Sequence, residues 1–252
     1  MPRRRPLVTV GTTFVTLCAA GFVPGRRTSR SETESGMNLE RARTQMLEQQ
    51  VRAWEVLDPR VLDAMAQVPR EEFVPPRYRG VAFADTAVPL AHRQVMMTPK
   101  VEGRLLQALD LKAGDRVLEI GTGSGFLAAC LAQLTAEVTT LEIFPDLSER
   151  AGRVLSRLAV PNVKLEVGDV FQAFPPGSYD AIAVTGSLPV YDPRLEGLLS
   201  RDGRLFLIVG QAPVMEALLV TRIGSEEYTR ESLFETVVPA LRNAPSPSAF
   251  EW

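Results

Sequence analysis

The sequence predicts an α/β fold built on a mostly parallel β-sheet. From residue 116 onward, short runs rich in apolar and β-branched residues alternate with helical stretches. Most of these runs are continuously apolar, which is typical of parallel strands that helices cover on both faces. The last two runs flank a turn-like Gly-Ser-Glu-Glu stretch, so we expect an antiparallel pair to finish the sheet.

The expected helices before the sheet begin at residue 37. Apolar residues at helical spacing predict a helix over 37–53. A second helix begins at Asp58-Pro59, because Asp can cap a helix and Pro suits its first position, and it ends before Pro69. Residues 72–79 form a Pro-rich loop, 82–90 an extended segment and 101–109 a further helix. Strands are expected at 116–120, 137–143, 163–167, 179–186, 204–210, 217–223 and 232–238. The helices between them are expected at 125–134, 146–158 and 192–199.

The composition indicates a globular protein and excludes several kinds of site. The 252 residues are 45% hydrophobic and 23% charged, enough for one domain with a well-buried core. The formal net charge of −2 gives no global basic field for nucleic acid. Two cysteines exclude a Cys-rich metal site and one histidine excludes a His cluster, so we expect no metal.

Residues 1–36 differ from the rest of the chain. They hold six arginines against two glutamates and contain a weakly apolar stretch that imitates a signal peptide. Four threonines dilute this stretch, which makes a membrane span a poor interpretation. Export or anchoring is one alternative, and an over-extended N-terminus with Met37 as the true start is another. We expect 1–36 to be a poorly ordered basic extension and 37–252 to be a single domain.

The strongest motif is a glycine loop, VLEIGTGSGF, over 117–126. A buried strand leads directly into Gly121, Thr122, Gly123 and Gly125, and a helix follows. Glycines allow a sharp turn and the close approach of a ligand, and the helix N-terminus directs unpaired N–H groups at that ligand.

Three acidic residues strengthen the assignment of a nucleoside site. Glu119 ends the strand before the loop, Glu142 ends the next strand, and Asp169 in the Gly168-Asp169-Val170 stretch ends the third. The carboxyl ends of parallel strands meet at one edge of a sheet, where an acid can accept ribose hydroxyls or an adenine amino group. Phe126 stands where a dinucleotide loop needs glycine. An acid beside the loop disfavours pyrophosphate and suits an ammonium group, which indicates S-adenosylmethionine.

With these motifs the chain resembles the protein-L-isoaspartate O-methyltransferase family over about residues 46–241. DPRVLDAMAQVPREEFVPP, AFADTAVPL, VLEIGTGSG, NVKLEVGDV, YDAIAVTGSLP, GRLFLIVG and ETVVPAL occur in family order. The resemblance implies a Rossmann-like, seven-strand methyltransferase sheet, mostly parallel with a C-terminal antiparallel strand and with helices on both faces. It also implies methyl transfer from S-adenosylmethionine to a side-chain carboxylate of damaged aspartyl residues in proteins or peptides.

One segment departs from the family. In the family, the loop before the sheet reads roughly Gly-Gln-Thr-Ile-Ser-Gln-Pro. The matching stretch is RQVMMTP over 93–99, so the family's threonine becomes Val95 and its active-site serine becomes Met97. Thr98, one position along, is a candidate replacement for the lost hydroxyl. The substrate-side candidates are Asp85, Gln94, Val95 and Met96.

The altered loop leaves three functional hypotheses open. The first is isoaspartyl protein repair, the second a methyltransferase of the same fold with a different acceptor, and the third an S-adenosylmethionine-binding protein with little catalysis. A carboxylate is already ionised at neutral pH, so the absence of a His or Cys base excludes none of them. We expect a cytoplasmic monomer without stable membrane association.

Overall fold

The computed structural model describes residues 30–246. The compact unit that carries the fold begins at Leu39. Helix α1 (Arg30–Met46) runs into a π-helical turn, η1 (Leu47–Val51), and a 3-10 turn, η2 (Arg52–Trp54), which confirms the helix expected over 37–53. Residues 30–36, expected to be poorly ordered, belong to α1, because adding residues to an existing helix is easier than nucleating one. Residues 1–29, the rest of the expected extension, lie outside the described residues.

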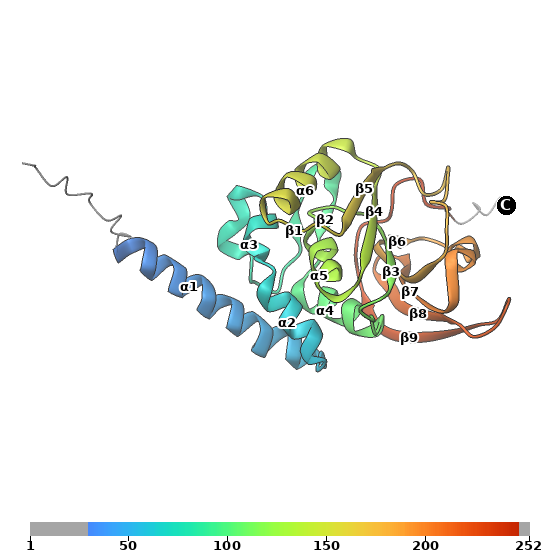
Figure 1. The fold of residues 1–252 in the computed structure, drawn as a ribbon, viewed down its shortest axis with the longest axis horizontal. Helices are drawn as coiled ribbons and strands as arrows, with labels where there is room; N and C mark the ends of the chain where they lie inside the picture. Colours follow the sequence, from blue (N-terminus) through green and yellow to red (C-terminus); the bar gives the residue numbers. More distant parts are fainter. Residues whose placement is uncertain (1–29, 247–252) are drawn as a thin grey trace, which may run out of the picture. The chain divides into compact units, whose positions relative to one another are not determined.

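A seven-stranded sheet forms the centre of the compact unit (Figure 1). Its spatial order is β5-β4-β3-β6-β7-β8-β9, and the strands from β5 to β7 are all parallel. After β5 the chain crosses to the opposite side of β3, so the order of the strands reverses there. Ligands of open α/β sheets bind at such a reversal, beyond the carboxyl ends of the strands. The strands are β3 (Arg116–Ile120), β4 (Glu137–Glu142), β5 (Val163–Val167), β6 (Tyr179–Leu188), β7 (Leu199–Gln211), β8 (Val214–Arg222) and β9 (Tyr228–Thr236).

The end of the sheet is antiparallel, as expected. β8 pairs antiparallel with both β7 and β9, so β8 is the strand that runs against the others. The strands at the centre of the sheet bury nearly every side chain, including Leu118, Ile120, Ile182 and Val184, which explains their continuous apolar runs. The predicted α/β class, with a mostly parallel sheet that ends in antiparallel strands, is therefore confirmed.

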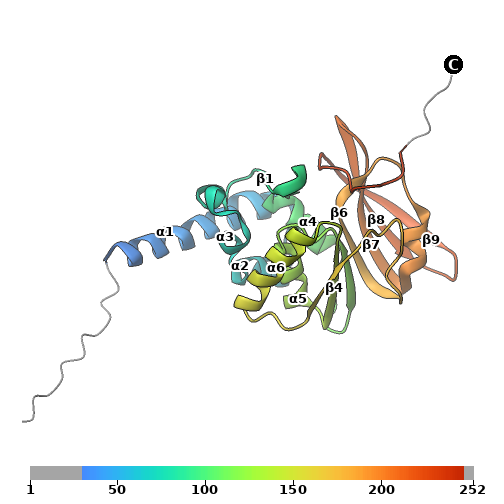
Figure 2. The same ribbon diagram turned by 90° about the horizontal axis from the view of Figure 1, so that it is seen from above.

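The two faces of the sheet are covered unequally (Figure 2). The four helices α2 (Pro59–Gln67), α4 (Pro99–Ala108), α5 (Phe126–Leu134) and α6 (Pro145–Arg157) share one apolar cluster with one face. The other face packs on the short 3-10 helix η5 (Pro193–Leu198) and on Phe171 and Phe174. The α-helix expected over 192–199 is thus a shorter 3-10 helix. Helical segments lie on both faces, as predicted, but among residues 30–246 the second face has only this short one.

Local sequence explains most helix boundaries. The Asp58 carboxylate accepts the Arg60 N–H at 2.8 Å and Pro59 is the first residue of α2, which confirms the predicted cap. Helix α4 begins at Pro99, two residues before the expected start. In the described residues, no helix is both long and apolar enough to cross a membrane.

The segment before α4 is less extended than expected. Only β1 (Val88–Pro89) within 82–90 is a strand, and it pairs antiparallel with β2 (Val95–Met96). Short-range hydrogen bonds such as Thr86 N–H to the Ala84 carbonyl, 2.8 Å, turn the chain before β1. Helix α3 (Arg70–Phe73) and the 3-10 turns η3 (Pro76–Val81) and η4 (Ala91–Arg93) complete this region.

Candidate active site

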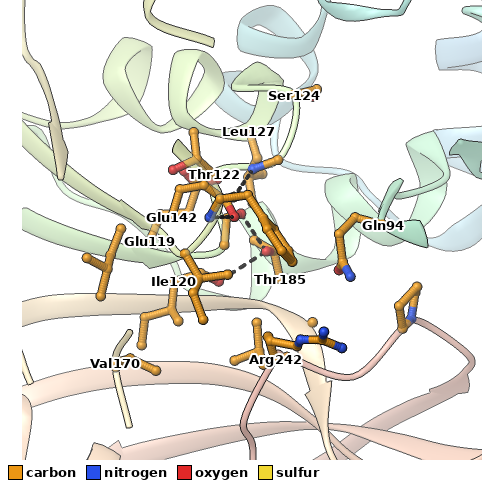
Figure 3. Close-up of a pocket in the computed structure, with 18 of the residues that line it drawn as sticks. Gln94, Glu119, Ile120, Thr122, Ser124, Leu127, Glu142, Val170, Thr185 and Arg242 are labelled. Carbon is orange, nitrogen blue, oxygen red and sulfur yellow. Dashed lines mark hydrogen bonds between the residues drawn. The ribbon is translucent and has the colours of Figure 1, made fainter. Parts of the chain in front are cut away.

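A pocket lies beyond the carboxyl ends of β3, β4 and β6. Its empty space, including the solvent at its open mouth, measures about 830 Å³. Its glycine-loop wall consists of residues 119–123, Glu142 and 168–170 (Figure 3). Its methionine wall consists of residues 94–97. A return segment, residues 237–243, follows β9 and closes the pocket with Pro239, Leu241 and Arg242. Three regions far apart in the sequence therefore meet where the order of the strands reverses.

Gly121 and Gly125 are required by backbone shape and by close packing. Gly121 has φ +98°, and a Cβ there would lie 2.3 Å from Thr185 Oγ1. The Thr185 hydroxyl donates to the Gly121 carbonyl at 2.6 Å and fixes the turn on β6. Gly125 has φ +85° and precedes α5, where a Cβ would lie 2.9 Å from the Ala151 Cβ of α6. Gly125 therefore shapes the loop without lining the pocket.

Glu142 is aimed at the glycine loop by two backbone donors. One carboxylate oxygen accepts the Gly123 N–H at 2.8 Å, and the other accepts the Phe144 N–H at 3.0 Å. The side chain is buried at the end of β4 and lines the pocket. Each carboxylate oxygen keeps a free lone pair, so the group can also accept hydroxyls from a bound ligand.

Glu119 is a fully buried carboxyl group with an unused oxygen. Its Oε2 accepts the Thr140 hydroxyl, which also contacts the Thr122 hydroxyl at 2.6 Å, while Oε1 is buried without a partner among the described residues. Burial raises the pKa of Glu119 to about 8, and the nearby negative charges of Glu142 and Glu102 add to the rise. A buried carboxyl without a partner at a pocket wall suits a cationic ligand group.

Asp169 lies at the far end of the glycine-loop wall. One of its oxygens accepts the Phe171 N–H at 2.9 Å, and the other accepts the Asn243 side-chain amide at 2.8 Å. The Gly168 N–H donates to the Glu142 carbonyl at 2.9 Å, so the ends of β4 and β5 stay together here. The structure thus brings together all the predicted cofactor residues, with Gly125 just behind the wall.

The methionine wall contains four of the six other candidates. Gln94, Val95, Met96 and Met97 line the pocket, and both methionines are buried. Asp85 and Thr98 do not line it. The Asp85 carboxylate accepts Lys100 Nζ at 2.8 Å, and the buried Thr98 hydroxyl, at the start of α4, has no partner in the part of the chain described.

Arg70 fixes the methionine wall from behind. Its fully buried guanidinium donates to the Met97 carbonyl at 2.7 Å and to the Ala82 carbonyl at 2.9 Å, and it pairs with the buried Glu102 carboxylate. It also lies 4.7 Å over the ring of Phe126, the first residue of α5. Burial raises the pKa of Glu102, and the charge of Arg70 opposes that rise. One side chain thus joins the methionine wall to the helix after the glycine loop.

Comparisons with known proteins agree with this geometry. Residues 41–240 match the family model described as protein-L-isoaspartate(D-aspartate) O-methyltransferase. The chain belongs to this family.

Two relatives illustrate the match. Protein-L-isoaspartate O-methyltransferase 1 of Rhodopseudomonas palustris (strain HaA2) is 39% identical over 216 residues, which cover 82% of this chain and 88% of the relative. The protein-L-isoaspartate O-methyltransferase of Methanoculleus marisnigri is 40% identical over 189 residues, which cover 74% of this chain and 86% of the relative.

A solved structure from Plasmodium falciparum, described as a protein-L-isoaspartate O-methyltransferase in complex with S-adenosyl-L-homocysteine, has a TM-score of 0.69. The two chains are 22% identical, and the match covers 79% of this chain and 98% of the Plasmodium chain. At this identity the likeness supports the fold. The predicted family and its seven-strand fold are confirmed.

Several pocket residues of this family member were not predicted. Thr185 and Gly186 lie near the carboxyl end of β6, at the same sheet edge as the three acids, so the rule that located those acids also applies to them. Phe144 follows Glu142 by two residues and stacks on the His92 ring at a centroid distance of 4.1 Å. Glu102 and Arg242 carry no sequence signal of this kind, because a helix and a loop remote from the glycine motif bring them to the pocket.

Proposed function

We propose that this chain transfers the methyl group of S-adenosylmethionine to the free carboxylate of damaged, isoaspartyl residues in proteins. The observation that carries the proposal is the buried Glu119 oxygen without a partner, beside a glycine loop and the aimed Glu142 carboxylate. Together they suit a ligand that combines a ribose with an ammonium group. Family membership supports the carboxylate as acceptor.

Each residue of the glycine-loop wall has a role in holding the cofactor. Glu142 accepts the ribose hydroxyls, Asp169 accepts the adenine amino group, and Glu119 faces the ammonium group. Gly121, Thr122 and Gly123 allow close approach of the backbone, and Gly168 and Val170 border the adenine. When bound, S-adenosylmethionine supplies an electrophilic methyl group.

The protein's own contribution to the chemistry is positioning. A carboxylate acceptor is ionised at neutral pH, so no residue has to remove a proton from it. Holding donor and acceptor in line supplies roughly 7–11 kcal/mol of barrier lowering. The apolar side chains of Val95, Met96 and Met97 exclude water from the acceptor side, which strengthens the attraction between opposite charges.

An assay with labelled methyl donor and an isoaspartyl peptide tests the proposal. We expect a base-labile methyl ester to form, and no label on the same peptide with an ordinary aspartate. The Glu137→Gln variant, changed at the opposite end of β4 from Glu142, serves as a control for general damage and should remain active. Tight cofactor binding with no ester formed on any isoaspartyl peptide would contradict the proposal.

A second candidate function is methyl transfer to a different acceptor. The methionine wall favours it, because buried Met97 stands where the family has a serine hydroxyl and Thr98 does not line the pocket. A variant of this candidate is a cofactor-binding protein with weak catalysis. Label transfer to an apolar or neutral acceptor, in preference to the isoaspartyl peptide, would establish it.

We also propose that the protein works as a cytoplasmic monomer on protein or peptide substrates and not on nucleic acid. The cofactor and the mild net charge support this proposal. Light scattering should give the mass of one chain, 27.6 kDa or less if the N-terminus is processed. Cell fractionation should recover the protein with cytoplasmic markers.

A further inference from the structure

We propose that Arg242, on the return segment, binds the carboxylate of the methyl acceptor. This inference rests on the proposed function, because it gives that acceptor a binding partner in the pocket. It makes Arg242 the residue that selects a negatively charged acceptor, a role that the altered methionine wall cannot supply with hydroxyl groups.

The charges that line the pocket create the need for such a residue. Among the lining residues that the structure describes, four are acidic and one is a cation, Arg242; the acids are Glu102, Glu119, Glu142 and Asp169. Glu102 is paired with the buried Arg70 guanidinium and burial raises the pKa of Glu119 to about 8, so the repulsion that an entering carboxylate meets comes mainly from Glu142 and Asp169. Arg242 is the one lining side chain whose charge offsets that repulsion.

The backbone on both sides of Arg242 is fixed. The Leu241 N–H donates to the Ser187 carbonyl at 2.9 Å, at the end of β6, and the Ser187 N–H donates to the Pro239 carbonyl at 3.0 Å. On the other side, the Asn243 amide donates to Asp169 at 2.8 Å. The guanidinium is therefore carried by an anchored loop and not by a loose chain end.

The side chain of Arg242 has no other partner in the part of the chain that the structure describes. It is exposed and forms no hydrogen bond or ion pair there, whereas Arg204 and Arg230 each pair with an acidic residue at 2.7 Å. Figure 3 draws Arg242 and Gln94 reaching the same end of the pocket from different segments. Its planar, always-charged guanidinium can bind a carboxylate through two parallel hydrogen bonds.

The chemistry predicts which kinetic constant depends on Arg242. Transfer turns a cationic donor and an anionic acceptor into two products without those charges, so the acceptor's negative charge is already reduced in the transition state. A cation that binds the acceptor therefore stabilises the bound substrate at least as strongly as the transition state. Loss of Arg242 should raise KM for the peptide more than it lowers kcat.

The test measures charge preference by calorimetry in the presence of S-adenosylhomocysteine. One ligand is an isoaspartyl peptide and the other is the same peptide with its free carboxylate converted to an amide. We expect the wild-type protein to bind the carboxylate form roughly fivefold or more tightly, the preference to disappear in Arg242→Gln, and part of it to return in Arg242→Lys. Arg201→Gln, which changes another exposed arginine near the start of β7, should keep the full preference.

Each outcome has a defined meaning. An Arg242→Gln protein that keeps the wild-type preference, or a wild-type protein without any preference, overturns the inference. Unchanged affinity of Arg242→Gln for S-adenosylhomocysteine shows that the variant is folded and the cofactor site intact. A wild-type protein that prefers the carboxylate peptide through Arg242 but never methylates it supports the inference and contradicts the proposed function.

Discussion

The two principal walls of the pocket are built in opposite ways. The glycine-loop wall is polar, and its acids are aimed by backbone N–H groups and by a buried threonine hydroxyl. The methionine wall is apolar and rests on a two-residue strand, β2, which Arg70 holds from behind. The difference teaches that cofactor binding is fixed by the main chain of the sheet, whereas acceptor choice depends on a few replaceable side chains.

Arg70→Met should have the largest effect, because Arg70 is what joins the two walls. Removing it leaves the Glu102 carboxyl buried without its partner and frees the Met97 carbonyl. We expect a loss of about 3 kcal/mol in the free energy of unfolding, measured by urea denaturation.

Two controls sharpen this prediction. The double variant Arg70→Met, Glu102→Leu removes both charges and should recover most of the lost stability. Arg157→Met, which breaks an exposed pair with Glu72, should change stability little. If the single Arg70 variant were as stable as the wild type, the walls would be held together by something else.

Glu142→Gln should come next and should affect the glycine-loop wall alone. It removes the charge that we propose accepts the ribose hydroxyls, so we expect a tenfold or greater loss of S-adenosylhomocysteine affinity by calorimetry, about 1.5 kcal/mol or more. Glu137→Gln, at the exposed opposite end of the same strand, is the matched control. Equal affinities for the two variants would remove the ribose assignment.

A pH dependence should follow from Glu119, whose pKa is about 8 in the folded protein against an ordinary 4.5. A cationic ammonium group favours the ionised carboxylate, so cofactor affinity should rise as the pH increases from 7 to 8, before the ligand's own amino group loses its proton. Glu119→Gln should bind more weakly and lose this dependence. A flat profile in the wild type would mean that the ammonium group binds elsewhere.

The same carboxyl group affects folding stability with a defined sign. Between pH 4.5 and 8 the folded protein keeps a proton on Glu119 that the unfolded chain releases. Stability therefore falls as pH rises through this window, and Glu119→Gln should reduce that fall. Thermal unfolding of both proteins across the window measures it.

Met97→Ser should have the smallest effect and should be confined to the methionine wall. Restoring one neutral hydrogen bond to the acceptor is worth about 1 kcal/mol, so we expect isoaspartyl kcat/KM to rise about fivefold with no change in cofactor affinity. Met96→Ser, at the neighbouring buried position, is the matched control. A rate unchanged by Met97→Ser would show that this residue does not limit the reaction.

The sequence predicted the glycine-loop wall better than the methionine wall, for a physical reason. Strand ends and glycine turns are local features, and parallel strands bring their carboxyl ends to one edge, so Glu119, Glu142 and Asp169 could be located together. Residues 90–100 have no clear period, and most of the extended segment expected over 82–90 is a series of turns. Nothing local in the sequence indicates that a buried arginine from α3 supports the methionine wall, or that an exposed arginine after β9 reaches the pocket.

The return segment also has a consequence for synthesis of the protein. Pro239, Leu241 and Arg242 complete a pocket whose glycine loop is translated more than a hundred residues earlier. A nascent chain can therefore form much of the sheet while its cofactor crevice still lacks one side. Tight binding of the methyl donor, and any stabilisation it brings, must wait until the return segment has been translated and has left the ribosome.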